Sequence, residues 1–128
     1  MASVRRHIWI DSPADNVWAL VSDVGSIADW FPSIDESSGD ANSRVCIVDG
    51  NRVVEDIVTN DHQQRRLQYV VSEGYPVEHH LATVDVIEND DGCLVVYSTD
   101  VKPDEMGELV GAALEGGLGG LKATSEAS

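Results

Sequence analysis

Four polar side chains with acid–base or hydrogen-bonding chemistry lie in strand-like segments of the sequence: Glu55, Tyr69, His80 and Tyr97. Alternate residues of a strand point to the same side of a sheet, so three of them share a side with apolar neighbours: Tyr69, His80 and Tyr97. A carboxylate beside an imidazole can act as a general acid–base pair, which makes Glu55 and His80 the candidate catalytic residues. The same two groups can instead form a buried hydrogen bond, and we expect this structural role.

Other reactive groups in the chain give no site. His79 and His80 are adjacent in a predicted strand and should point to opposite sides of the sheet, so we expect no metal site. Cys46 and Cys93 are far apart and lack CxxC spacing, which predicts two buried reduced thiols. His62 is expected to be an isolated surface residue. The sequence contains no GxSxG motif, phosphate loop or dinucleotide fingerprint, and we expect no cofactor.

Length and charge limit the classes of partner. The chain has 128 residues, of which 42% are hydrophobic, enough for one domain that spans residues 1–128. The net charge of −15 argues against binding to nucleic acid or to anionic membranes, which depends on Lys and Arg. No stretch approaches the ~20 apolar residues that span a bilayer, and no signal-peptide pattern opens the chain, so we expect a cytoplasmic protein. High salt and genome composition both remain explanations for the acidic, Lys-poor surface. A monomer or weak homodimer is expected.

The first thirty residues predict a strand and two short helices. Alternation indicates a strand over residues 4–10. A helix should follow, with Ser12 as its N-cap, Pro13 at its first position and an apolar stripe at helical spacing. A second short helix should end near Trp30, because Pro32 disfavours helical geometry at the residue before it.

The middle of the chain predicts antiparallel strands. Asp49-Gly50 separates two β-branched runs and is the strongest hairpin signal. Further alternating segments occupy residues 65–74, 79–88 and 93–101, the last two separated by a turn at 89–92.

After Pro103 the apolar period becomes helical, predicting a long helix over residues 104–122 and a frayed tail over 123–128. Six glycines between residues 107 and 120 oppose this helix, so it requires packing to hold it. The pairs 116–117 and 119–120 could bend the helix and open the mouth of a cavity, or could reflect tight packing of the helix on the sheet or simple fraying.

Strands grouped between helices predict an α+β domain. We expect a curved antiparallel sheet of about seven strands, in the order β-α-α-β6-α, wrapped around the long C-terminal helix. Such an arrangement leaves a hollow where the inward side chains do not fill it.

Three segments resemble the START-like or SRPBCC helix-grip superfamily, which includes bacterial polyketide cyclase/dehydrase proteins, the birch-pollen allergen group and plant abscisic acid receptors. They are "IDSPADNVWALVSDVGSIADWFPSI", "DGNRVVEDIV" and "DGCLVVYSTDVKP". The similarity extends over residues 4–122, which should form the ordered core. It implies that a small hydrophobic or amphipathic ligand, such as a lipid, a polyketide or a quinone-like compound, binds between the sheet and the C-terminal helix.

The resemblance also implies pocket positions. Trp30 should face the hollow with Phe31 packed beneath it, and Glu55 should face the cavity. His80 stands where the family usually has Tyr, and Tyr97 where it usually has Trp, which predicts a more polar pocket. The full set of expected ligand-binding residues is Trp30, Glu55, Tyr69, Val71, Tyr75, His80, Ala82, Tyr97, Val110 and Leu114.

Two alternatives remain open. The first is a cyclase or dehydratase that uses His80 and Glu55 as acid and base. The second is a protein-interaction module, which a large exposed apolar patch would favour, and the sequence shows no clear patch.

Overall fold

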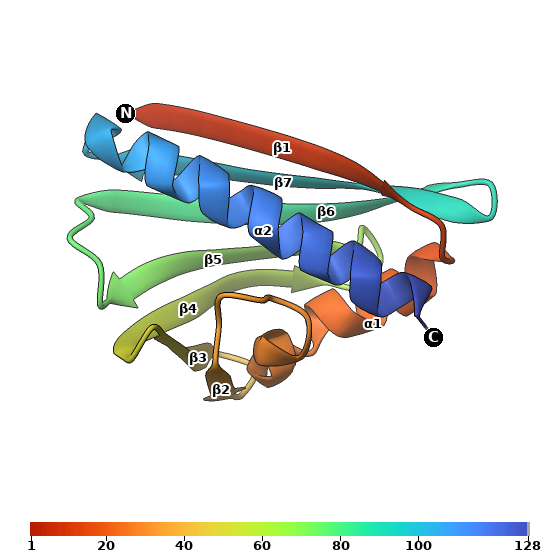
Figure 1. The fold of residues 1–128 in the computed structure, drawn as a ribbon, viewed down its shortest axis with the longest axis horizontal. Coiled ribbons are helices and arrows are strands. Elements are labelled where there is room, and N and C mark those ends of the chain that lie inside the picture. Colours follow the sequence, from red (N-terminus) through yellow and green to blue (C-terminus); the bar gives the residue numbers. More distant parts are fainter. Residues whose placement is uncertain (128) are drawn as a thin grey trace.

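The computed structural model describes residues 1–127 and has the predicted α+β architecture (Figure 1). A seven-stranded antiparallel sheet has the order β1-β7-β6-β5-β4-β3-β2. Helix α2 lies diagonally across one face of this sheet, and α1 lies near the C-terminal end of α2. The strands are β1 (Ala2–Ile10), β2 (Glu36–Gly39), β3 (Ser43–Val48), β4 (Asn51–Asp61), β5 (Arg66–Glu73), β6 (His79–Asn89) and β7 (Gly92–Lys102).

The N-terminal helices differ in detail from the prediction. Helix α1 (Ala14–Ser22) begins one residue after Pro13, which occupies the cap position, and no side chain caps it. Ser12 is therefore not the N-cap that the sequence suggests. The second helix is a 3-10 helix, η1 (Val24–Asp29), and the chain leaves it at Trp30, as Pro32 predicts.

The turns between strands follow the sequence signals. Asp49 and Gly50 both adopt positive φ (53° and 80°), the geometry of the tight turn that suits antiparallel strands. The second predicted turn, before Gly92, places Asp90 at φ 53°. The short strand β2 has no apolar alternation, and the sequence did not locate it.

The C-terminal helix is longer than expected. A 3-10 turn, η2 (Asp104–Met106), leads into α2 (Gly107–Glu126), which continues beyond the expected end at Lys122. Lys122 Nζ donates to Trp9 O (2.9 Å) and to a carboxylate oxygen of Glu126 (2.6 Å). These bonds tie the last turn to β1, so residues 123–126 are helical rather than a frayed tail. Ser128 of that expected tail lies outside the described residues.

The segment from Trp30 to Pro32 packs directly against α2. A Cβ at Gly117 would lie 2.5 Å from the Phe31 ring, and one at Gly120 would lie 2.1 Å from Trp30 O. By contrast, Gly116 and Gly119 have open space in the direction of a Cβ. The glycine pairs therefore provide close packing.

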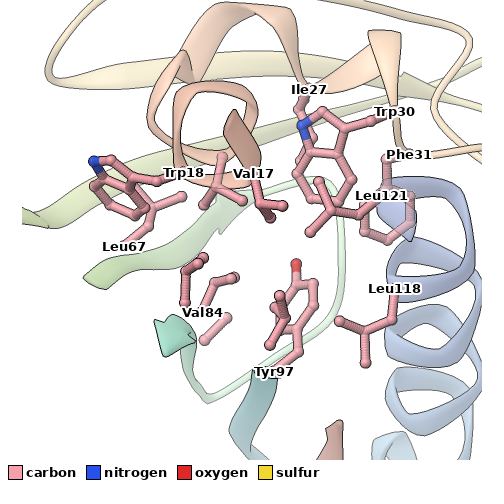
Figure 2. Close-up of a cluster of buried hydrophobic side chains, with 14 of the residues drawn as sticks. Val17, Trp18, Ile27, Trp30, Phe31, Leu67, Val84, Tyr97, Leu118 and Leu121 are labelled. Carbon is pink, nitrogen blue, oxygen red and sulfur yellow. The ribbon is translucent and has the colours of Figure 1, made fainter. Parts of the chain in front are cut away.

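The core joins both helices to the sheet. Figure 2 shows Trp30 and Phe31 beside Leu118 and Leu121 of α2, with Trp18 of α1 at the other side of the same cluster. These five side chains are all buried. The cluster thus holds the glycine-rich helix in place, as its composition requires.

Trp18 also makes a contact that the sequence did not predict. Its Nε1 donates to Nδ1 of His62 (3.0 Å), and the two rings meet edge to face. His62 is exposed but is not isolated.

The opposite side of the sheet carries a short apolar row. Trp9, Leu94 and Ile87 are neighbours in register across β1, β7 and β6. Trp9 is 44% exposed and Ile87 is 48% exposed. The row becomes visible only when the strand register is known.

Candidate functional site

A cavity of about 380 Å³ lies between the sheet and α2. Its apolar walls come from η1, the segment after it, the inner strands, the segment between β5 and β6, and the N-terminal half of α2. These residues are Ile27, Phe31, Ile34, Val48, Val53, Val71, Val77, Met106, Leu109, Val110, Ala112, Ala113 and Leu114. Polar or sulfur-bearing side chains complete the lining: Ser33, Cys46, Glu55, Tyr69, Tyr75, His80, Tyr97 and Thr99.

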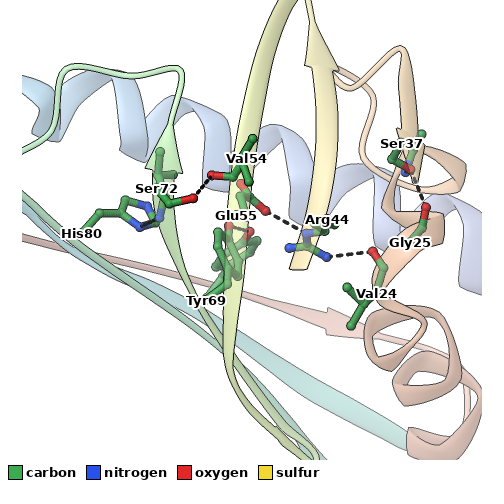
Figure 3. A network of polar contacts seen from close by, with 12 residues as sticks. Val24, Gly25, Ser37, Arg44, Val54, Glu55, Tyr69, Ser72 and His80 are labelled. Atoms are coloured by element: carbon green, nitrogen blue, oxygen red, sulfur yellow. Dashed lines mark hydrogen bonds and ion pairs between the residues drawn. The ribbon is translucent and has the colours of Figure 1, made fainter. Parts of the chain in front are cut away.

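Glu55 is held by a buried ion pair with Arg44 (Figure 3). The two residues are opposite each other on β3 and β4, and Arg44 Nε donates to Glu55 Oε1 at 2.7 Å. Arg44 is 1% exposed, and its Nη1 also donates to Val24 O at 3.3 Å. Burial is the largest single influence and disfavours the charged guanidinium, but the attraction of Glu55, the phenols of Tyr69 and Tyr97 and the hydrogen bond to Glu55 together raise the pKa of Arg44.

Tyr69 and Tyr97 share a hydrogen bond between their hydroxyl groups. Burial is the main reason that the pKa values of both phenols are raised, so both are neutral at physiological pH. The Arg44 guanidinium lies 4.7 Å from the centre of the Tyr69 ring, which adds a cation–π contact to the ion pair. The phenols are therefore hydrogen-bonding groups rather than bases.

His80 is a neutral imidazole at the edge of the cavity. The backbone N–H of Val71 donates to its Nδ1 (3.1 Å), so the proton of the neutral ring is on Nε2. Burial and, second, the charge of His79 lower its pKa to about 4. The Tyr69 ring lies beside it, with centroids 5.7 Å apart.

Most of the expected pocket residues line the cavity: Glu55, Tyr69, Val71, Tyr75, His80, Tyr97, Val110 and Leu114. Trp30 and Ala82 are buried but are not part of the lining. The expected roles of Trp30 and Phe31 are thus reversed, because Phe31 borders the cavity while Trp30 packs in the core.

The expected pairing of Glu55 with His80 does not occur. Glu55 bonds to Arg44, whereas His80 bonds to the Val71 backbone. Arg44 was not among the expected site residues, although it alternates with Cys46 and Val48 in β3 and so shares their side of the sheet. That alternation was the signal that could have identified it.

The remaining reactive groups are His79 and the two cysteines. His79 is exposed while His80 lines the cavity, as predicted for adjacent strand residues. Both cysteines are free and buried, and burial chiefly raises the pKa of Cys46 to about 12. Within residues 1–127, no helix is long and apolar enough to cross a membrane.

Comparison with known proteins places this geometry in a family. Residues 1–126 match the family model described as polyketide cyclase / dehydrase and lipid transport. A comparison with curated proteins found no significant match.

Solved structures share the fold over nearly the whole chain. XoxI from Bacillus cereus is 24% identical with a TM-score of 0.91, covering 98% of this chain and 96% of that one. A Thermobifida fusca protein solved by NMR is 28% identical with a TM-score of 0.81, covering 95% and 91%. Norcoclaurine synthase from Thalictrum flavum, in complex with dopamine and hydroxybenzaldehyde, is 19% identical with a TM-score of 0.75, covering 96% and 85%. The match over residues 1–126 and the helix-grip architecture show that the chain belongs to the polyketide cyclase/dehydrase and lipid transport family of the START-like, SRPBCC superfamily.

Proposed function

We propose that this protein binds a small hydrophobic or amphipathic molecule in the cavity between the sheet and α2. Its family binds lipid or polyketide ligands or catalyses cyclisation. The observation that carries the proposal is the cavity of about 380 Å³, with mainly apolar walls and a few converging polar groups. This combination is typical of small-molecule sites, which range over about 300–1,000 Å³.

The cavity size favours a compact ligand. Its volume lies near the lower end of that range, so a single-ring or fused-ring polyketide, a quinone-like compound or a short lipid suits it better than a diacyl lipid. Tyr75 and Leu109 line the cavity and are also 37% and 58% exposed, which identifies their side as the side facing solvent.

Acid–base catalysis has less support from this arrangement. A general base is most effective when its pKa is near the operating pH, and the lowered pKa of His80, about 4, makes it a weak base at neutral pH. Glu55 already accepts a hydrogen bond from Arg44 and makes none with His80.

The test is ligand capture combined with a cavity-filling variant. Native mass spectrometry of protein purified from its own host should detect a co-purified molecule, and the neutral dye Nile red should bind the emptied protein. Val71→Phe places a larger side chain in the cavity and should weaken dye binding by at least about tenfold, because the added ring occupies space that the dye needs.

Val70→Phe is the matched control. Val70 is the neighbouring residue on β5 and is not part of the cavity lining, so this variant should bind the dye like the original protein. Equal binding by both variants, or a protein that neither captures a molecule nor binds dye, would refute the proposed function.

A further inference from the structure

The charge inside the cavity comes from one carboxylate. Among the residues that line it in the described part of the chain, Glu55 is the one Asp or Glu, and none is Lys or Arg. Arg44 is buried behind this lining, where it donates to Glu55 and to Val24 O. A ligand in the cavity therefore meets the carboxylate and not the guanidinium.

Glu55 retains an acceptor for a ligand. Its Oε1 accepts from Arg44, and within residues 1–127 no hydrogen bond reaches its Oε2. The residue is only 8% exposed and lines the cavity, so this oxygen is available there rather than on the open surface. A buried carboxylate oxygen is stabilised by a hydrogen-bond donor and destabilised by a second negative charge.

His80 provides a hydrogen-bond donor to the cavity. Its Nδ1 is occupied by the Val71 N–H, so Nε2–H is a donor, and this group has no acceptor among the described side chains and backbone groups. Residues Glu55 and Val71 are partners in the β4–β5 register, and His80 bonds to Val71. The acceptor on β4 and the donor on β6 thus lie on either side of β5, on the same cavity face.

We propose that the cavity selects uncharged ligands that carry a hydroxyl or N–H group for Glu55 and a carbonyl-type acceptor for His80, and that it rejects carboxylates and phosphates. This selectivity rests on the proposed ligand-binding function and specifies its chemistry. Rejection follows because an anionic group would approach Glu55 in a site where the lining offers no positive charge.

Three naphthalene compounds of similar size test the selectivity by calorimetry at neutral pH. They are 6-acetyl-2-naphthol, which has both groups, 2-acetyl-6-methoxynaphthalene, in which a methoxy group replaces the hydroxyl donor, and 6-hydroxy-2-naphthoic acid, which is an anion. We expect the naphthol to bind about ten- to hundredfold more tightly than the methoxy compound, since its hydroxyl can donate to the Glu55 carboxylate and the methoxy group cannot. The acid should bind at least about tenfold more weakly than the naphthol.

The variant Arg44→Met/Glu55→Gln removes both charges together, because a single substitution would leave a buried charge unpaired and risk unfolding. In this double variant the difference in affinity between the naphthol and the acid should shrink. The control Val70→Phe should keep the difference that the original protein shows. Equal affinities for the three compounds, or tightest binding of the acid, would overturn the selectivity while leaving ligand binding intact. Failure of all three compounds and of Nile red to bind would instead refute the proposed function on which it rests.

Discussion

Replacing neighbouring glycines of α2 by alanine should change stability in opposite directions. At Gly119 a Cβ meets nothing within 4 Å, so Gly119→Ala should stabilise the protein by up to about 1 kcal/mol through helix propensity and reduced freedom of the unfolded chain. At Gly120 a Cβ would lie 2.1 Å from Trp30 O and 2.5 Å from Pro32 Cδ. These are backbone and ring atoms that cannot move independently, so the clash should cost about 1–3 kcal/mol or more and outweigh the propensity gain.

Urea unfolding followed by tryptophan fluorescence and circular dichroism measures both changes. Gly119→Ala should raise the urea midpoint, with Tm higher by a few degrees, and Gly120→Ala should lower both at an unchanged m value. Gly116→Ala is the control, because its Cβ also meets open space and should behave like Gly119→Ala. A Gly120→Ala protein as stable as Gly119→Ala would refute the close packing of α2 on the segment from Trp30 to Pro32.

Three further predictions concern the cavity. Gly117→Ala should push the end of the Phe31 ring toward the cavity that it borders. The loss in the free energy of Nile red binding should therefore exceed the loss in the free energy of unfolding, and an unchanged affinity for the dye would contradict this. Arg44→Met alone should lower the free energy of unfolding by about 3–5 kcal/mol, because the charge of Glu55 is left buried without its partner. In urea titrations, the double variant Arg44→Met/Glu55→Gln should recover most of this loss. Equal losses in the single and double variants would show that the two residues are not coupled. Because the folded-state pKa of His80, about 4, lies below its unfolded value of about 6.5, the unfolded chain binds the proton more readily. The free energy of unfolding should therefore fall as pH decreases from about 6.5 to about 4, and His80→Gln should reduce that slope; an identical pH profile for both proteins would show that the imidazole is not buried as described.

Local patterns in the sequence were enough to predict the order of elements. The tight turn at Asp49-Gly50 and the end of the second helix before Pro32 follow from backbone preferences that operate within a few residues. Strand alternation likewise placed Tyr69, His80 and Tyr97 toward the cavity, because the two-residue repeat of a strand fixes which side each residue faces. The short strand β2, which has no apolar alternation, shows where this signal ends.

The partners of those side chains could not be predicted from the same patterns. Alternation shows that Glu55 and His80 are candidates for one cavity, but Glu55 pairs with Arg44 because the β3–β4 register puts them opposite each other. His80 instead accepts a hydrogen bond from the backbone N–H of Val71, which links β6 to β5. The reversal of Trp30 and Phe31 has a similar cause, since the side that faces the cavity depends on where α2 lies.

By itself, the sequence determined the class of fold, the turns, the faces of the strands and the acidic character of the protein, all of which depend on local conformation or composition. Tertiary structure alone decided what holds the predicted glycine-rich helix and that it continues to Glu126, because Gly117 and Gly120 pack closely against Phe31 and Trp30, an effect that isolated helix propensity does not include. It also decided that the cavity exposes a carboxylate while its arginine is buried behind it. Both results come from contacts between residues far apart in the chain, and local spacing does not encode those distances.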